Sequence, residues 1–121
     1  MSKKILVVED TEDNRQILRD LLSRAGYDII EANDGAEGVA KASEHKPDLI
    51  LMDIQMPVMD GYEATRLIKA DPALKAIPVI AVTSYALSGD EEKARTAGCD
   101  GHIAKPFSPR QMLAKVREII G

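Results

Sequence analysis

Four apolar stretches of this chain each end in a reactive or charged side chain. In chain order, these are Glu9 and Asp10 after Ile5–Val8, Asp53 after Leu49–Met52, Thr83 after Val79–Val82, and Lys105 after His102–Ala104. If the stretches are parallel strands of one sheet, their ends meet at its carboxyl edge, where open α/β sheets bind ligands. Three carboxylates, a hydroxyl and an ammonium gathered there indicate a magnesium-assisted site for a phosphoryl group.

Asp53 is the candidate nucleophile of this group. A carboxylate can attack phosphorus and hold the phosphoryl group as an acyl phosphate. An anionic nucleophile must then approach an anionic donor, so the reaction needs charge neutralisation, which a dication supplies. Mg²⁺ prefers oxygen ligands in near-octahedral geometry and keeps several waters. We therefore expect Asp10, Asp53 and the backbone carbonyl of Gln55 to bind Mg²⁺. Glu9 would act directly or through a water.

Lys105 and Thr83 suit the phosphoryl oxygens. A lysine ammonium can pair with Asp53 at rest and with a phosphoryl oxygen afterwards, and a threonine hydroxyl can donate a hydrogen bond to another oxygen. Each feature alone is weak, because an acidic pair is also a common helix start and a loop lysine is usually a surface residue. Their joint appearance at matching strand ends favours the chemical interpretation.

Strand and helix patterns alternate from one end of the chain to the other. A more polar strand is predicted over 27–32. The first predicted helix has Ile17, Leu18, Leu21, Leu22 and Ala25 inside and Gly26 at its end, and the second covers 36–45 with Ala36, Val39 and Ala40 inside. The third runs from Asp60 to about Asp71 and the fourth from Ser88 to Gly98. The last begins at Ser108–Pro109 and has its apolar side chains inside: Met112, Leu113, Val116, Ile119 and Ile120.

This alternation predicts an α/β fold with a parallel sheet and right-handed crossovers. The first, third and fourth strands are apolar throughout, as strands covered on both faces should be. The second strand is mixed and the fifth is short, so both suit sheet edges. We therefore predict a three-layer sandwich: a five-stranded sheet in the order 2-1-3-4-5 with five helices. Its switch point, between the first and third strands, places Asp10 beside Asp53.

Length and composition limit the function classes. The 121 residues suit a single domain over 1–121. The net charge of -4 argues against nucleic acid or anionic membrane as direct partners. The longest apolar runs, about five residues, are far below the roughly 20 that span a bilayer, and no signal-peptide pattern is present. With a single cysteine, Cys99, the chain suits a reducing compartment. We expect a cytoplasmic protein.

The same residues resemble the receiver domains of two-component response regulators, which have the CheY-like, flavodoxin-like fold. The matching segments are Val7–Asp10, Leu51–Pro57, Met59–Gly61, Val82–Thr83 and Lys105–Phe107, and the resemblance covers essentially all 121 residues. It implies these roles: Asp53 as phospho-acceptor, Glu9 and Asp10 as the acidic metal pair, Gln55 as a main-chain metal ligand, Thr83 as the switch hydroxyl and Lys105 as the phosphate-contacting lysine.

The resemblance also implies partners. The phosphoryl group would come from a phosphohistidine of a sensor histidine kinase or a histidine phosphotransfer protein, and a downstream protein effector would receive the signal. The protein would be a monomer or weak dimer, and would catalyse only its own phosphoryl uptake and autodephosphorylation. Family geometry places partner choice around Asn14, Arg15 and Leu18, and on the face of the fourth and fifth helices. The segment from Thr83 to Lys105 is more similar to stand-alone cell-cycle receivers of the DivK type than to chemotaxis receivers.

His102 departs from the family pattern. Many receivers have a tyrosine or phenylalanine there, whose ring swings inward on activation. Three interpretations remain open: a coupled imidazole rotation, a pH-sensitive group, and a partly exposed edge-strand histidine. By resemblance, Gln55 and Tyr85 sit where receivers tune hydrolysis of the acyl phosphate; Tyr85 could equally be a loop residue that packs on the fourth helix.

The fourth predicted helix has mainly alanines, Ala94 and Ala97, on its inner side. Burying alanine yields far less than the roughly 1.5–3 kcal/mol of a large aliphatic side chain, so this helix should be easier to move. We expect Thr83 to move toward the phosphoryl group and the loop over 84–88 to follow. The surface of helix four, strand five and helix five would then be remodelled.

Three other function classes share some of these features. A phosphatase of the haloacid dehalogenase class also uses a strand-end aspartate, but it needs a second acid where this chain has Gln55. A flavodoxin-like cofactor binder would need a small-residue phosphate loop where this chain has Glu9, Asp10, Glu12 and Asp13. A receiver-like scaffold that does not phosphorylate is the remaining alternative, and the intact set of candidate site residues argues against it.

Overall fold

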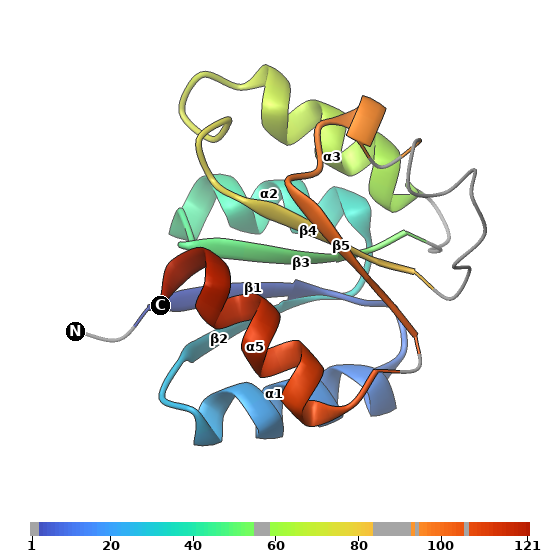
Figure 1. Cartoon of the computed structure of the whole chain (residues 1–121). Helices are drawn as coiled ribbons and strands as arrows, with labels where there is room; N and C mark the ends of the chain where they lie inside the picture. Colours follow the sequence, from blue (N-terminus) through green and yellow to red (C-terminus); the bar gives the residue numbers. More distant parts are fainter. Residues whose placement is uncertain (1–2, 55–58, 84–92, 94, 106) are drawn as a thin grey trace.

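Five parallel strands form one sheet in the order β2-β1-β3-β4-β5 (Figure 1). The strands are β1 (Lys4–Val8), β2 (Asp28–Ala32), β3 (Leu49–Asp53), β4 (Val79–Thr83) and β5 (Gly101–Ala104). Every neighbouring pair is parallel. The computed structural model describes residues 3–54, 59–83, 93, 95–105 and 107–121. The predicted strand order is confirmed.

Burial along the strands explains this order. All residues of β3 and β4 are buried, and in β1 only Lys4 is exposed. The edge strands β2 and β5 are mostly half-buried. Strands with helices on both faces read as continuous apolar runs, so the three inner strands are the ones whose sequences lack alternation.

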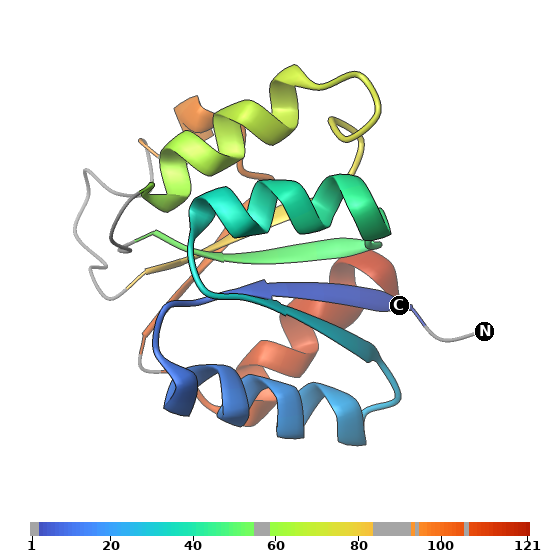
Figure 2. The same ribbon diagram turned by 180° about the vertical axis from the view of Figure 1, so that it is seen from behind.

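Helices cover both faces of the sheet. The four helices described from end to end are α1 (Glu12–Arg24), α2 (Gly35–His45), α3 (Gly61–Ala70) and α5 (Pro109–Ile120). Figures 1 and 2 show α1 and α5 on one face and α2 and α3 on the other. Each face has its own aliphatic core, because neighbouring strand residues point to opposite sides: Val7 and Leu51 pack toward α1 and α5, whereas Val8 and Met52 pack toward α2 and α3.

The fourth predicted helix is described only in part. Lys93 and residues 95–97 are helical, while 84–92 and Ala94 lie outside the described residues. The starts of α3 and α5 agree with their predicted caps. The Asp60 carboxylate accepts a hydrogen bond from the Glu63 backbone at 2.9 Å. The Ser108 hydroxyl accepts a hydrogen bond from the Gln111 backbone N–H at 3.1 Å. In return, the Ser108 backbone N–H donates to Oε1 of the Gln111 side chain.

Two predicted helix faces were partly wrong. In α2, Ala36 and Ala40 are exposed, whereas Gly35, Gly38 and Ala42 are buried. A Cβ on Gly38 would lie 2.9 Å from Cγ2 of Val8, so the helix approaches β1 more closely than alanine permits. In α1 the buried stripe is Arg15, Leu18 and Leu22, and Ile17 is 59% exposed. The inner face of α1 therefore includes the buried Arg15, whereas Ile17, which was predicted to lie inside, is exposed.

Candidate metal and phosphoryl site

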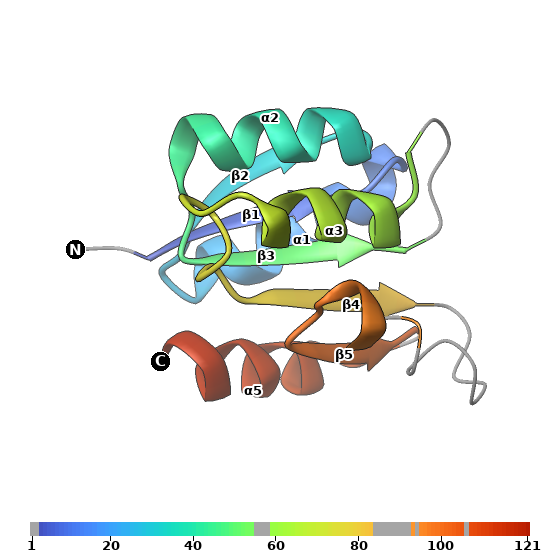
Figure 3. The ribbon, with the colours of Figure 1, turned by 90° about the horizontal axis from the view of Figure 1, so that it is seen from above.

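The predicted site residues within the described chain gather at the edge where the strands end. Figure 3 shows the strand arrowheads pointing to this edge and the C-terminus of α5 at the other. The register sets their neighbours: Val8 pairs with Met52, Asp53 with Val82, and Thr83 with Ala104. The residues that end or follow β1, β3, β4 and β5 are therefore brought side by side.

Three carboxylates form the acidic part of the site. Glu9, Asp10 and Asp53 each offer an oxygen, and the three oxygens lie within 4.8 Å of one another. Glu9 and Asp53 are 3% and 6% exposed, whereas Asp10 is exposed. Hard oxygen ligands at this spacing with one side open to water fit Mg²⁺, which keeps part of its hydration shell. A cation would also relieve the repulsion between the like charges.

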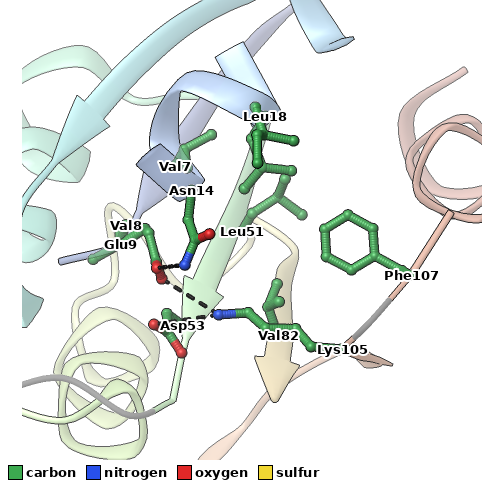
Figure 4. Close-up of a pocket in the computed structure, with 11 residues that line it drawn as sticks. Val7, Val8, Glu9, Asn14, Leu18, Leu51, Asp53, Val82, Lys105 and Phe107 are labelled. Carbon is green, nitrogen blue, oxygen red and sulfur yellow. Dashed lines mark hydrogen bonds and ion pairs between the residues drawn. The ribbon is translucent and has the colours of Figure 1, made fainter. Parts of the chain in front are cut away.

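Lys105 places an ammonium against the two buried acids. Its Nζ lies 3.6 Å from Oε2 of Glu9 and 3.7 Å from Oδ2 of Asp53 (Figure 4). Its backbone N–H donates to the Thr83 carbonyl at 2.7 Å, which ties β5 to the end of β4. One side chain thus partly neutralises two carboxylates, one that follows β1 and one that ends β3.

Glu9 is fixed by residues from three directions. Its backbone N–H donates to Ala32 at 3.0 Å, and its Oε1 accepts from Nδ2 of Asn14 at 2.7 Å. Burial alone would raise the Glu9 pKa. Hydrogen bonds with Asp53 and Asn14 and the Lys105 charge outweigh that effect and lower the pKa below its ordinary value. Glu9 is therefore ionised at neutral pH and suited to a cation.

A tight helix start supports the backbone of Asp53. The Gly61 N–H, at the first turn of α3, donates to the Ile54 carbonyl at 3.1 Å, and Thr65 Oγ1 donates to the Gly61 carbonyl at 2.7 Å. A Cβ on Gly61 would meet the Asp53 carbonyl oxygen and lie 2.8 Å from Cα of Ile54. Only glycine lets α3 begin this close to the strand that carries Asp53.

The other predicted residues divide into three groups. Thr83 is the last residue of β4 and is 5% exposed, at the same edge as Asp53. His102 is exposed on β5, which agrees with the interpretation of an edge-strand histidine. Gln55, Tyr85 and the loop over 84–88 lie outside the described residues.

Sequence reasoning missed the two residues of α1 that act on Glu9, and expected them at a partner surface instead. Asn14 binds its side chain, and Nη1 of Arg15 donates to its carbonyl oxygen at 2.7 Å. The spacing in the sequence could have predicted these contacts. A helix that starts two residues after the acidic pair has its first turn close to the strand end, so its side chains can reach Glu9.

A cavity of about 500 Å³ opens beside the charged group. Its walls are mainly apolar and come from the sheet, α1 and the segment before α5, with Val7, Leu18, Leu51, Val82 and Phe107 among them (Figure 4). Glu9, Asp53 and Lys105 line its polar end. Asp53 therefore borders both the acidic cluster and a mostly apolar cavity.

Comparison with known proteins identifies the family. The model of the response regulator receiver domain matches residues 5–117. The polar-differentiation response regulator DivK of Brucella anthropi is 45% identical over 121 residues, which cover 100% of this chain and 98% of DivK. The chain is similar to the chemotaxis protein CheY4 of Vibrio cholerae, with a TM-score of 0.94, 30% identity, and coverage of 98% of this chain and 99% of CheY4.

A further solved structure bears on the metal. The receiver domain of a sensor histidine kinase from Pseudomonas aeruginosa holds a magnesium ion in its active-site cleft, and matches 100% of this chain and 99% of its own, with 37% identity and a TM-score of 0.93. In the part of the chain that the structure describes, none of the helices could span a bilayer.

The chain belongs to the response regulator receiver family, the phosphorylation-dependent switches of two-component signalling.

Proposed function

We propose that the whole chain, 1–121, acts as one receiver domain that accepts a phosphoryl group on Asp53 with Mg²⁺. Glu9, Asp10, Asp53 and the backbone carbonyl of Gln55 would hold the ion. The observation that carries the proposal is the charge arrangement: three carboxylate oxygens within 4.8 Å, with the Lys105 ammonium 3.7 Å from Oδ2 of Asp53. Such an arrangement suits an anion that must attack another anion.

Each side chain has a separate part in the reaction. When bound, Mg²⁺ neutralises charge on the carboxylates and on the incoming phosphoryl group. A carboxylate oxygen of Asp53 attacks phosphorus, the P–N bond of the phosphohistidine breaks, and the imidazole leaves with the bonding electrons. Lys105 then exchanges its contact with Asp53 for a phosphoryl oxygen, and the Thr83 hydroxyl donates to another. Hydrolysis of the same acyl phosphate resets the protein, so it catalyses reactions only on itself.

Receiver domains partner with histidine kinases and effectors. For this chain the donor would be a sensor histidine kinase or a histidine phosphotransfer protein. Of the positions on α1 expected to contact it, Arg15 and Leu18 are only 9% and 6% exposed. Ile17 is 59% exposed and lines the same cavity as Asp53, which supports a docking role for this residue. A downstream effector would read the face that includes β5 and α5.

Intact mass spectrometry tests the proposal. After incubation with acetyl phosphate and Mg²⁺, the wild type should gain about 80 Da, the mass of one phosphoryl group. Asp53→Asn should gain nothing under the same conditions, and EDTA should suppress the wild-type adduct. An unmodified wild type would favour the scaffold alternative. An equal adduct on Asp53→Asn would place the modification elsewhere.

A further inference from the structure

We infer that Arg15 is a positioning residue of the metal site, which fixes the peptide between Glu9 and Asp10 in the orientation that binds a divalent cation. The inference rests on the proposed function and assigns to Arg15 an internal role in place of partner contact. It makes α1 a support of the metal site as well as a docking helix.

The guanidinium of Arg15 joins three parts of the fold. It is 9% exposed and sits in the inner stripe of α1. Nη1 donates to the Glu9 carbonyl at 2.7 Å and Nη2 to Oε2 of Glu12 at 2.5 Å. Nε lies 3.5 Å from Oε1 of Glu31 on β2. The planar, multidentate guanidinium can serve acceptors in fixed directions, which a lysine ammonium cannot.

The bond to the Glu9 carbonyl matters because of the peptide to which this oxygen belongs. The carbonyl carbon of Glu9 is bonded to the nitrogen of Asp10, so the plane of this peptide sets the direction in which both carboxylates leave the backbone. The Glu9 N–H is already bonded to Ala32. With Arg15 on the carbonyl, both backbone polar groups of Glu9 are fixed. Glu12 and Glu31 balance the guanidinium charge.

Arg19, one turn further along α1, provides a matched control. Its guanidinium contacts the same two acids, with Nη1 2.9 Å from Oε2 of Glu31 and Nη2 3.8 Å from Oε1 of Glu12. Its described contacts do not include the Glu9 carbonyl, and its side chain is 36% exposed. Replacing Arg19 therefore removes ion pairs with the same acids and leaves the peptide bonded.

The test is the Mg²⁺ dissociation constant of the unphosphorylated chain, measured by isothermal titration calorimetry well below the unfolding temperature of each variant. Arg15→Met should bind Mg²⁺ about tenfold more weakly, at the lower end of the range for outer-shell partners of metal ligands. Arg15→Lys should recover part of the affinity, because its ammonium can still donate to one acceptor. Arg19→Met should stay within about twofold of the wild type, as for a surface ion pair.

Two results would overturn the inference: a folded Arg15→Met with wild-type affinity, or an equal loss in Arg15→Met and Arg19→Met. If Arg15→Met does not fold, the comparison is between Arg15→Lys and Arg19→Lys. Weaker Mg²⁺ binding by Arg15→Lys than by Arg19→Lys supports the inference, and equal binding by the two variants overturns it. A wild type that binds no Mg²⁺ would instead overturn the proposed metal site, and the inference with it, so the two failures are distinguishable.

Discussion

At the scale of single residues, the site concentrates negative charge and relies on one ammonium to hold it in the resting state. Glu9 follows β1, Asp53 ends β3, and both are buried. Lys105 lies less than 4 Å from each of them, at 3.6 and 3.7 Å. The same side chain therefore contributes to stability before phosphorylation and, in the proposed mechanism, to charge neutralisation afterwards.

Replacing Lys105 should make stability depend on pH in a defined direction. In the wild type the Glu9 pKa is below 4.5, so Glu9 favours folding above that pH, and the contribution is lost as pH falls through the lowered pKa. In Lys105→Met the lowering effect of the lysine charge and hydrogen bond is lost, so the Glu9 pKa should be higher than in the wild type. We expect a loss of about 1–3 kcal/mol near neutral pH, below the full cost of breaking a buried pair because the lysine is partly exposed.

Urea unfolding of wild type and Lys105→Met at pH 7 and at a pH below 4.5 checks this prediction. The difference in unfolding free energy should grow from the lower pH to the higher, because the Lys105 ammonium attracts Glu9 only when this carboxylate is ionised. The matched control is Lys115→Met, whose side chain contacts Glu118 at 3.9 Å on the surface of α5. A Lys105→Met deficit that is the same at both pH values would contradict the electrostatic account.

At the scale of elements, two helices approach the sheet through glycine at points next to the site. Gly38 of α2 packs on Val8, the residue before Glu9, and Gly61 of α3 packs on the Asp53 backbone. Both helices thereby set the positions of strand ends that carry carboxylates. Gly38 buries no side chain, so hydrophobic periodicity favoured Ala36 and Ala40 as the inner face of α2. A pattern of apolar side chains cannot reveal a close backbone contact at glycine, because glycine has no side chain.

Gly38→Ala should destabilise the protein even though alanine is the better helix former. The new Cβ would lie 2.9 and 3.0 Å from the two Cγ atoms of Val8, a branched side chain at the end of a buried strand. Overpacking of this kind costs about 1–3 kcal/mol, against about 1 kcal/mol gained in helix propensity. We expect a net loss of about 1 kcal/mol by urea unfolding.

A second background isolates the contact. When Val8 is already alanine, Gly38→Ala should become neutral or stabilising, because the Cγ atoms that it meets are gone and only helix propensity remains. Ala40→Gly, at an exposed position of α2, measures propensity alone in the same helix. A stabilised Gly38→Ala single variant would show that α2 can move away from β1 at little cost.

At the scale of the whole molecule, the strand order and the meeting of the candidate site residues could be predicted, because both depend on features of each strand by itself. Apolar runs distinguish inner from edge strands, and a residue at a strand end stays at the sheet edge whatever the helices do. The orientation of α1 could not be predicted in this way. Whether Arg15 or Ile17 faces inward depends on acceptors, the Glu9 carbonyl and Glu31, that only the assembled fold supplies.

The stability of the whole molecule should also depend on the balance between charge repulsion and metal binding in the acidic cluster. Asp10 is exposed, yet its oxygen lies within 4.8 Å of oxygens of Glu9 and Asp53, which are both buried. Asp10→Asn should therefore raise the free energy of unfolding in EDTA, by up to about 1 kcal/mol as for other exposed charges. A residue that destabilises the resting fold is expected where a site is built for a cation.

Thermal unfolding with and without Mg²⁺ tests this balance. Wild-type stability should rise with Mg²⁺ by RT ln(1 + [Mg²⁺]/Kd), about 1.4 kcal/mol for each tenfold excess over the dissociation constant. Asp10→Asn should gain little from Mg²⁺, despite being the more stable protein in EDTA. Sodium chloride at equal ionic strength is the control, because screening also relieves repulsion between exposed charges. If sodium chloride stabilises the wild type as much as Mg²⁺ does, or if Asp10→Asn keeps the full Mg²⁺ response, then Asp10 is not a ligand and the acidic cluster acts only as a charged surface.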